Sequence, residues 1–166
     1  AQGGSDVETL DALKQRGPYV IKSRYRAVTK EDFEVLALQS SNALARAICL
    51  PSTEREGEVC MIIVPKFDMN KRDYKLKLVP SNELIRRVKN YLDERRLVTV
   101  KVNVERPQYV ELSINIEIIR STTGSSERLK RDIELALRKF LHPVVGGRDG
   151  QGWVFGRSVY KVDLYH

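Results

Sequence analysis

The sequence predicts an α+β domain in which helices pack on one face of an antiparallel sheet. Residues 98–104 and 110–118 alternate between apolar and polar side chains, the period expected of strands covered on one face. Residues 84–92 and 129–141 carry apolar stripes at helical spacing. From residue 58 the expected order is strand, helix, strand, strand, helix and a possible closing strand. That is the split βαβ (ferredoxin-like) order.

Two helices and an extended arm precede this core. Ser5-Asp6-Val7-Glu8 forms a capping box, in which a hydroxyl and a carboxylate satisfy the free amides of a helix start. This first helix should stop by Gly17-Pro18. Residues 19–28 then read as an arm that is half apolar and half basic. A second helix begins at Thr29-Lys30-Glu31-Asp32 by the same capping logic and ends near residues 40–42.

The remaining elements follow in order. Strands are expected at about 43–50 and 58–65, and a third helix after Pro80-Ser81. Ser125 or Ser126 should cap the fourth helix, which His142-Pro143 ends. We therefore divide the chain into residues 1–42 (helices and arm), 43–145 (ferredoxin-like core) and 146–166 (glycine-rich loop and aromatic tail).

Composition indicates a globular chain of 166 residues with a sizeable core, since 42% of residues are hydrophobic and 31% are charged. The net charge of +7 is dispersed, as on a solvated surface, although it could also serve nucleic acid or an acidic protein partner. No apolar run approaches the roughly 20 residues of a membrane span, and no secretory signal opens the sequence. The first residue is Ala1, so we expect a processed chain or part of a longer protein.

Cys49 and Cys60 lie on the two strands joined by the loop near Glu54-Arg55. Equal offsets from the loop would place them roughly opposite each other, so a disulfide bridge is conceivable. The alternative is a pair of small, buried and reduced core residues. Two cysteines are too few for a disulfide framework.

The sequence contains no catalytic constellation, and we predict no enzyme activity, no cofactor, no metal and no small-molecule substrate. The two histidines, His142 and His166, have no metal-ligand partner at a familiar spacing, and we interpret His142 as a polar residue at a helix end. The glycines between 146 and 156 lack the strand and helix that frame a phosphate-binding loop. They are typical of a loop that needs positive φ angles.

A ferredoxin-like nucleic-acid-binding module is the alternative from another functional class. Such a sheet binds RNA when its open face carries aromatic side chains on which bases stack. The wetter face of the central segments has no aromatic residue and three acidic ones: Thr99, Lys101, Asn103, Glu105, Glu111, Ser113, Asn115 and Glu117. This face counts against nucleic acid as a partner.

Several stretches, in order along the whole chain, resemble the C-terminal portion of the baseplate J-like proteins, a group of baseplate assembly proteins. The most specific stretch is Gly152-Trp153-Val154-Phe155-Gly156-Arg157, and the run from Arg26-Ala27-Val28-Thr29 to Glu31-Asp32-Phe33 is nearly as good. The other stretches are 3–10, 23–25, 45–47, Leu50-Pro51, 92–97, 140–143 and 146–151. Val154 stands where the family leads us to expect proline, and Val144-Val145 is plainer than usual.

The resemblance implies a structural role without catalysis, in the wedge of a contractile baseplate of a phage tail or a phage-tail-like injection system. Expected partners are other copies of the chain and other wedge, hub or sheath-proximal proteins, first in the cytoplasm and then in a virion or particle. We predict subunit contacts in the arm and the tail because both mix aromatic and basic residues; the alternative is that they stabilise one compact monomer. The predicted contact residues are Tyr19, Ile21, Arg24, Tyr25, Arg26, Arg148, Trp153, Phe155, Arg157, Tyr160 and Tyr165.

Overall fold

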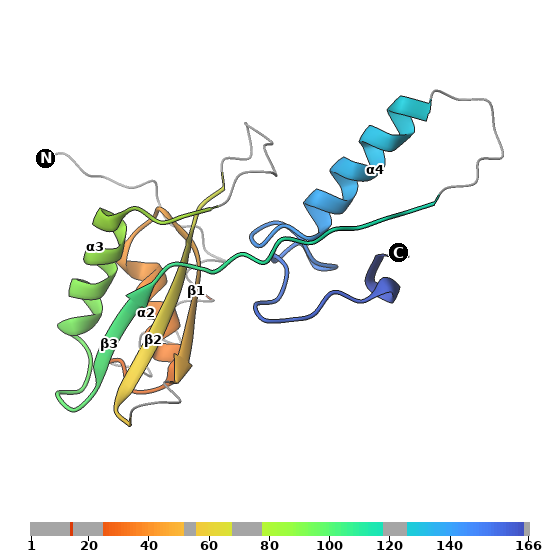
Figure 1. Ribbon diagram of the computed structural model, residues 1–166. Helices are drawn as coiled ribbons and strands as arrows, with labels where there is room; N and C mark the ends of the chain where they lie inside the picture. The colour runs from red at the N-terminus through yellow and green to blue at the C-terminus, as the bar shows by residue number, and fades with distance from the viewer. Residues whose placement is uncertain (1–13, 15–24, 52–55, 68–77, 118–125, 165–166) are drawn as a thin grey trace, which may run out of the picture. The chain divides into compact units, whose positions relative to one another are not determined.

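A computed structural model describes residues 14, 25–51, 56–67, 78–117 and 126–164 (Figure 1). Contacts divide the chain into two compact units. Unit 1 comprises Ala1–Pro65 and Val79–Pro107, and unit 2 comprises Lys66–Leu78 and Gln108–His166. The division into 1–42, 43–145 and 146–166 has different limits and stays a prediction. The described elements are α2 (Lys30–Ser40), β1 (Leu44–Pro51), β2 (Glu58–Pro65), α3 (Asn82–Asp93), β3 (Lys101–Glu105), α4 (Ser126–Phe140) and the 3₁₀ helix η1 (Lys161–Leu164).

Helix α2 begins where the capping box predicts. The Thr29 hydroxyl accepts a hydrogen bond from the Asp32 amide at 3.2 Å, and the Asp32 carboxylate accepts one from the Thr29 amide at 2.9 Å. Ser81 caps α3 in a similar way, because its hydroxyl accepts from the Leu84 amide at 3.2 Å. Apart from Lys14, which is helical, the predicted first helix lies outside the described residues, as does most of the arm.

The sheet of unit 1 is mixed and has the strand order β1-β2-β3. Strands β1 and β2 pair antiparallel, with Ala47 opposite Ile63 and Cys49 opposite Met61. Strand β3 lies parallel to β2 on its other side, and α3 makes the connection between them. The predicted α+β class is confirmed, and β2, α3 and β3 form a small arrangement of the βαβ type.

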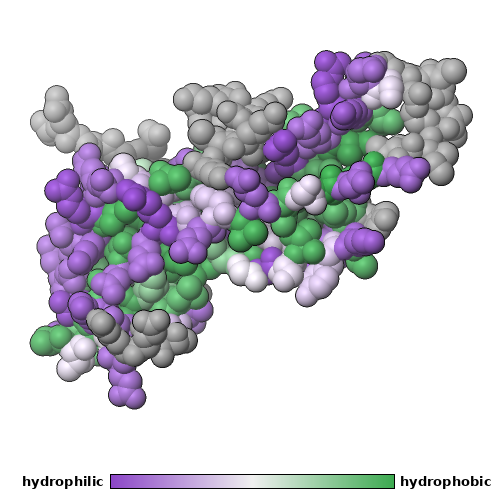
Figure 2. All heavy atoms as spheres, in the orientation of Figure 1, coloured by the Kyte–Doolittle hydropathy of each residue, from purple (hydrophilic) through white to green (hydrophobic). Residues whose placement is uncertain are grey.

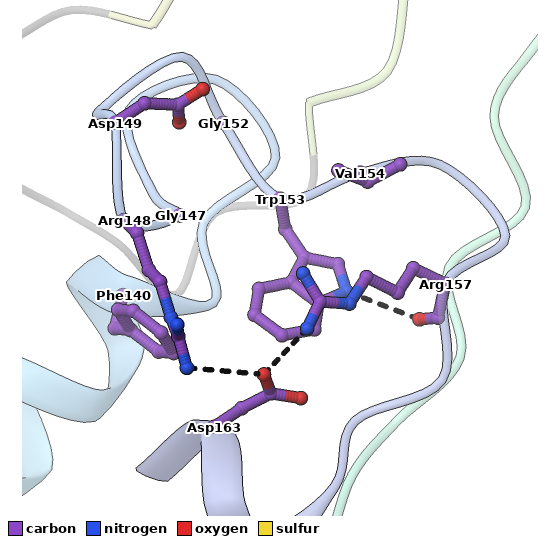
Figure 3. Close-up of a pocket in the computed structure, with 9 residues that line it drawn as sticks. All are labelled: Phe140, Gly147, Arg148, Asp149, Gly152, Trp153, Val154, Arg157 and Asp163. Atoms are coloured by element: carbon purple, nitrogen blue, oxygen red, sulfur yellow. Dashed lines mark hydrogen bonds and ion pairs between the residues drawn. The ribbon is translucent and has the colours of Figure 1, made fainter. Parts of the chain in front are cut away.

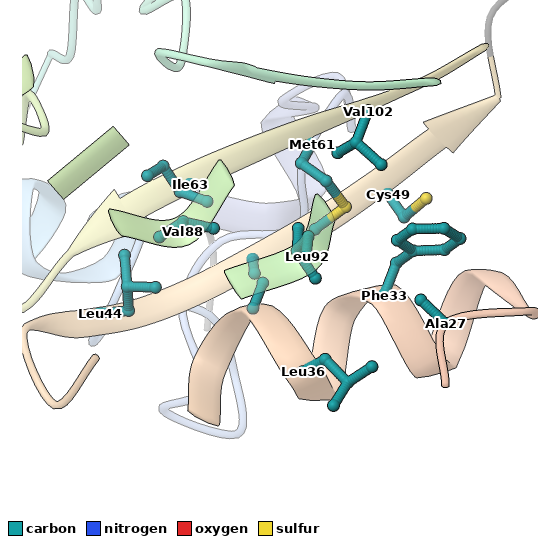
Figure 4. Packing of buried hydrophobic residues seen from close by; sticks show 12 residues of the cluster. Ala27, Phe33, Leu36, Leu44, Cys49, Met61, Ile63, Val88, Leu92 and Val102 are labelled. Atoms are coloured by element: carbon teal, nitrogen blue, oxygen red, sulfur yellow. The ribbon is translucent and has the colours of Figure 1, made fainter. Parts of the chain in front are cut away.

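The core lies on one face of this sheet, between the strands and helices α2 and α3 (Figure 4). Met61, Ile63, Val88 and Leu92 are all fully buried there. Other members of the cluster come from α2, β1 and β3, namely Phe33, Leu36, Ala37, Leu44, Ala47, Cys49 and Val102, with Ala27 before α2. The expectation that helices cover one face of the sheet therefore holds for α2 and α3.

The strand register keeps the two cysteines apart. Cys49 is opposite Met61 and faces the core, whereas Cys60 is opposite Leu50, one position along, and so points to the other face of the sheet. Both thiols are free. Burial raises the pKa of Cys49 to about 11, with a further contribution from Glu34. The interpretation as reduced residues holds, and Cys49 alone of the two is fully buried.

The two successive strands expected at 98–104 and 110–118 do not pair with each other in the described residues. Only Lys101–Glu105 is a strand, and it pairs in parallel with β2 instead of antiparallel with the following segment. The expected pairing with 110–118 was wrong because alternation fixes which face of a segment is apolar but not which strand lies beside it. The described part of the tail also contains no closing strand, since residues 161–164 form η1.

Unit 2 contains α4 and, beside it, the extended residues 110–117 (Figure 1). Tyr109 is held at the start of this segment, where its hydroxyl donates to the Leu78 carbonyl at 2.9 Å. No described residue of α4 is buried, although the helix carries the predicted apolar stripe. None of the described helices is both long enough and apolar enough to cross a membrane.

Candidate protein interface in the C-terminal loop

The glycine-rich loop is tied to the end of α4 by backbone hydrogen bonds. Gly147 donates to the Phe140 carbonyl at 2.8 Å, and both Gly146 (2.9 Å) and Trp153 (3.1 Å) donate to the His142 carbonyl. A Cβ atom at Gly146 would lie 2.7 Å from the His142 amide nitrogen and closer still to the two carbonyl oxygens. Only glycine fits at this point, and it lets the loop fold back to place Trp153 beside the helix end.

His142 supports the loop from inside. Its side chain is 3% exposed, and its Nδ1 accepts hydrogen bonds from the amides of Val144 (3.2 Å) and Val145 (3.3 Å). Its ring lies 4.5 Å from that of Phe67, centroid to centroid. Burial lowers the pKa of His142, and an accepting Nδ1 requires the neutral ring. His142 thus lies just after the end of α4, as predicted, and in its neutral form its ring holds the loop in place.

Trp153, Arg157 and Asp163 form the centre of the site (Figure 3). The Trp153 indole donates to the Arg157 carbonyl at 3.1 Å, and the Arg157 guanidinium lies 4.9 Å from the Trp153 ring centroid. Arg157 Nη2 donates to the Asp163 carboxylate at 2.5 Å. Phe140 meets the indole edge-on, with ring centroids 5.6 Å apart. Each side chain is therefore positioned by at least one directional contact.

The cluster carries more positive than negative charge. The Asp163 carboxylate also accepts a hydrogen bond from the Tyr160 amide at 3.1 Å, and it lies 4.0 Å from the guanidinium of Arg148. Its side chain is only 7% exposed, whereas those of Arg157 and Arg148 are 43% and 59% exposed. These residues border a pocket of about 190 Å³ together with Phe140, Gly147, Asp149, Gly152, Trp153 and Val154. Two exposed guanidiniums sharing one buried carboxylate favour an additional acidic group from outside.

The structure brings together three predicted contact residues in unit 2: Arg148, Trp153 and Arg157. Phe155, which is close to these residues in the sequence, is half-buried, and Tyr160 is 62% exposed. In unit 1, Tyr25 is 53% exposed with a φ of 60°, and Arg26 is exposed. The other predicted contact residues, Tyr19, Ile21, Arg24 and Tyr165, lie outside the described residues.

Sequence reasoning missed Asp163 and Phe140. Asp163 is the one acidic residue after Asp149, and it follows two basic residues, Arg157 and Lys161. That isolation was a usable signal for an internal counter-charge. Phe140 was assigned to the core stripe of α4, but its ring contacts Trp153 at the site. Among the described residues, no group of three or more His, Cys, Asp or Glu side chains could hold a metal ion.

Neither a protein-family model nor a curated protein matches the chain. A similar fold occurs in a chain of the "Cryo-EM structure of the anti-feeding prophage (AFP) baseplate, 6-fold symmetrised". The TM-score is 0.50 and the sequence identity is 18%, over 64% of this chain and 24% of that chain. At this identity the likeness is one of fold, and the chain spans about a quarter of its neighbour's length.

Proposed function

We propose that this chain is a structural component of a contractile baseplate, in the wedge of a phage tail or a phage-tail-like injection system, and acts by protein–protein assembly. The fold that it shares with a chain of a baseplate structure carries the proposal. The resemblance of its motifs to the baseplate J-like proteins supports it independently, because that resemblance lies in the residues themselves and not in the fold. The function needs no catalytic residue.

The C-terminal cluster supports an assembly role through its shape and charge. Trp153 is half-buried and fixed by Phe140 and Arg157, so a partner that covers it loses little conformational entropy. Aromatic and arginine side chains in such a position are typical anchors of protein interfaces. Arg148 and Arg157 extend from the same loop region and supply donors for a carboxylate of the partner. The partner surface should therefore be acidic at this point.

The test is to recover the full-length parent protein from its native cells, and to identify what accompanies it by mass spectrometry and negative-stain imaging. We expect sheath, tube and other wedge proteins in contractile particles. Recovery of RNA, or of no particle component, would contradict the proposal.

Two matched variants test the interface itself. Arg148→Gln removes an exposed guanidinium of the cluster, and Lys89→Gln removes an equally positive, exposed side chain on α3. We expect fewer assembled particles for Arg148→Gln and wild-type numbers for Lys89→Gln. Equal particle yields for the two variants would contradict a contact at the C-terminal loop, but they would leave the baseplate role intact.

A further inference from the structure

The turn between α3 and β3 carries an aliphatic side chain at its tip. Val98 is 97% exposed, and Leu97 beside it is 38% exposed. The Val100 amide donates to the Leu97 carbonyl at 3.0 Å, which closes a β-turn with Val98 and Thr99 at its centre. Figure 2 shows apolar atoms that project from the surface at this corner of unit 1. Turns favour glycine, proline, asparagine, aspartate and serine, so the turn itself gives no reason for a valine.

The side chain of Arg96 holds this turn in one conformation. Its Nη1 donates to the carbonyls of Leu97 (3.2 Å), Val98 (3.4 Å) and Val100 (2.6 Å). Its Nε donates to the Asp93 carboxylate at 2.6 Å, which fixes the guanidinium against the end of α3. The valine side chain is itself stiff, because its β-branch restricts χ1. A partner that covers Val98 therefore orders neither a loose backbone nor a flexible side chain, and this preorganisation favours binding.

The residues before α2 extend this surface. Ala27 forms a parallel bridge with Arg96, so the next residue along, Val28, lies beside Leu97. Val28 is 58% exposed, whereas Ala27 is buried in the core. Side chains alternate along extended backbone, so Arg26 lies on the same exposed side as Val28. We call Val28, Leu97 and Val98 the aliphatic corner, and Arg26 supplies a positive charge at its edge.

We propose that the aliphatic corner docks into an apolar hollow of another protein, with a carboxylate at the rim of the hollow that pairs with Arg26. This contact rests on the proposed assembly role and adds a contact on unit 1 to the C-terminal cluster of unit 2. A protein fits better than a lipid surface. The three aliphatic side chains carry fewer carbons than one myristoyl chain, which alone binds membranes only marginally.

Val98→Asp in the full-length parent protein tests the contact. Aspartate is favoured in turns and the side chain is exposed, so urea unfolding of the variant should keep the wild-type midpoint. In native cells the variant should lower the number of assembled particles at least about tenfold, because it places a charge in an apolar hollow. Val79→Asp is the matched control and should assemble normally, since Val79 is an aliphatic residue of unit 1 that is 54% exposed.

A photo-crosslinking amino acid in place of Val98 identifies the surface that the corner meets. Irradiation of native cells should join position 98 to a chain of the particle, at a site that mass spectrometry maps to aliphatic residues beside an aspartate or glutamate. The same amino acid in place of Val79 should give no such product. Flotation of the chain with vesicles of phosphatidylcholine and phosphatidylserine tests for a lipid surface, and we expect the chain to stay unbound.

Three results would overturn the docking: normal assembly of Val98→Asp, equal losses for Val98→Asp and Val79→Asp, or cross-links from position 98 that map only to polar surface. Vesicle binding that Val98→Asp abolishes would overturn it too, because the corner would then serve a lipid surface. Recovery of wild-type particles beside any of these results leaves the proposed function standing. If the unchanged parent protein brings down no particle component, the proposed function fails, and the mapped cross-link still decides whether the corner meets an apolar protein surface.

Discussion

Replacement of Asp163 by alanine should loosen the C-terminal cluster selectively. The carboxylate accepts from Arg157 at 2.5 Å and from the Tyr160 amide at 3.1 Å, and Arg148 lies 4.0 Å away. Without it, two guanidiniums face each other with no counter-charge between them. The Tyr160 amide loses its acceptor as well.

The expected loss lies between the limits for buried and exposed ion pairs. Breaking a buried pair costs about 3–5 kcal/mol, and an exposed pair contributes about 0–1 kcal/mol. Asp163 is almost fully buried, but Arg157 is 43% exposed, so water can solvate the released guanidinium. Because the guanidinium stays solvated, the ion pair itself contributes at the exposed limit of about 0–1 kcal/mol. Together with the lost amide bond of about 1 kcal/mol, the free energy of unfolding should fall by about 1–2 kcal/mol.

The chain has a single tryptophan, Trp153, and it lies in this cluster. Urea unfolding followed by its fluorescence therefore reports the site directly, and urea does not screen the ion pair as guanidinium chloride would. With an m-value of about 2 kcal/mol/M, the middle of the usual range, the urea midpoint should fall by roughly 0.5–1 M. Asp149→Ala is the control, because Asp149 is an exposed acidic residue of the same loop. Its one described hydrogen bond is accepted from the neighbouring Gln151 amide. A midpoint no lower than that of Asp149→Ala would refute the reasoning.

Three further predictions address the core, the loop and the thiols. Leu92→Ala should cost about 2–5 kcal/mol in thermal or urea unfolding, because Leu92 is fully buried, whereas Leu135→Ala, at a 51% exposed position, should cost under about 0.5 kcal/mol. Burial lowers the pKa of His142, so below the usual value of 6.5 the unfolded chain binds more protons than the folded chain. The free energy of unfolding should therefore decrease as the pH is lowered from 6.5, until the pH reaches the pKa of the folded state. His142→Gln should flatten this dependence between about pH 7 and pH 5, and an unchanged slope would contradict the assignment. A thiol reagent should label the half-buried Cys60 before the buried Cys49, and the reverse order by mass spectrometry would contradict the register.

Local chemistry made much of unit 1 predictable. The capping box at Thr29 and Asp32 requires only neighbouring residues, so the start of α2 follows from the sequence alone. The strand at Glu58–Pro65 and the helix after Ser81 were placed equally well. At both helix starts a signal within four residues decides the structure.

The partner of β3 could not be predicted in this way. Val102 and Val104 alternate as a strand should, but their neighbour is β2, more than 40 positions earlier in the chain. Helix α3 connects β2 to β3, so that β3 runs parallel to β2. No local signal in the sequence distinguishes this pairing from an antiparallel pairing of β3 with 110–118. At the site, Arg148, Trp153 and Arg157 were predicted from their residue types, but the role of Asp163 depends on a fold-back that only the structure shows.

The connection between Ala27 and the turn after α3 has a mechanical consequence. Ala27 forms a parallel bridge with Arg96, and its amide donates to the Arg95 carbonyl at 2.9 Å. One such hydrogen bond and one buried methyl group together stabilise this contact by only about 1–2 kcal/mol. A tensile load applied at Tyr25 would thus meet this bridge first and the Thr29 cap next, before the force reached the strands. The bridge acts as a weak link that would yield while the sheet stays intact.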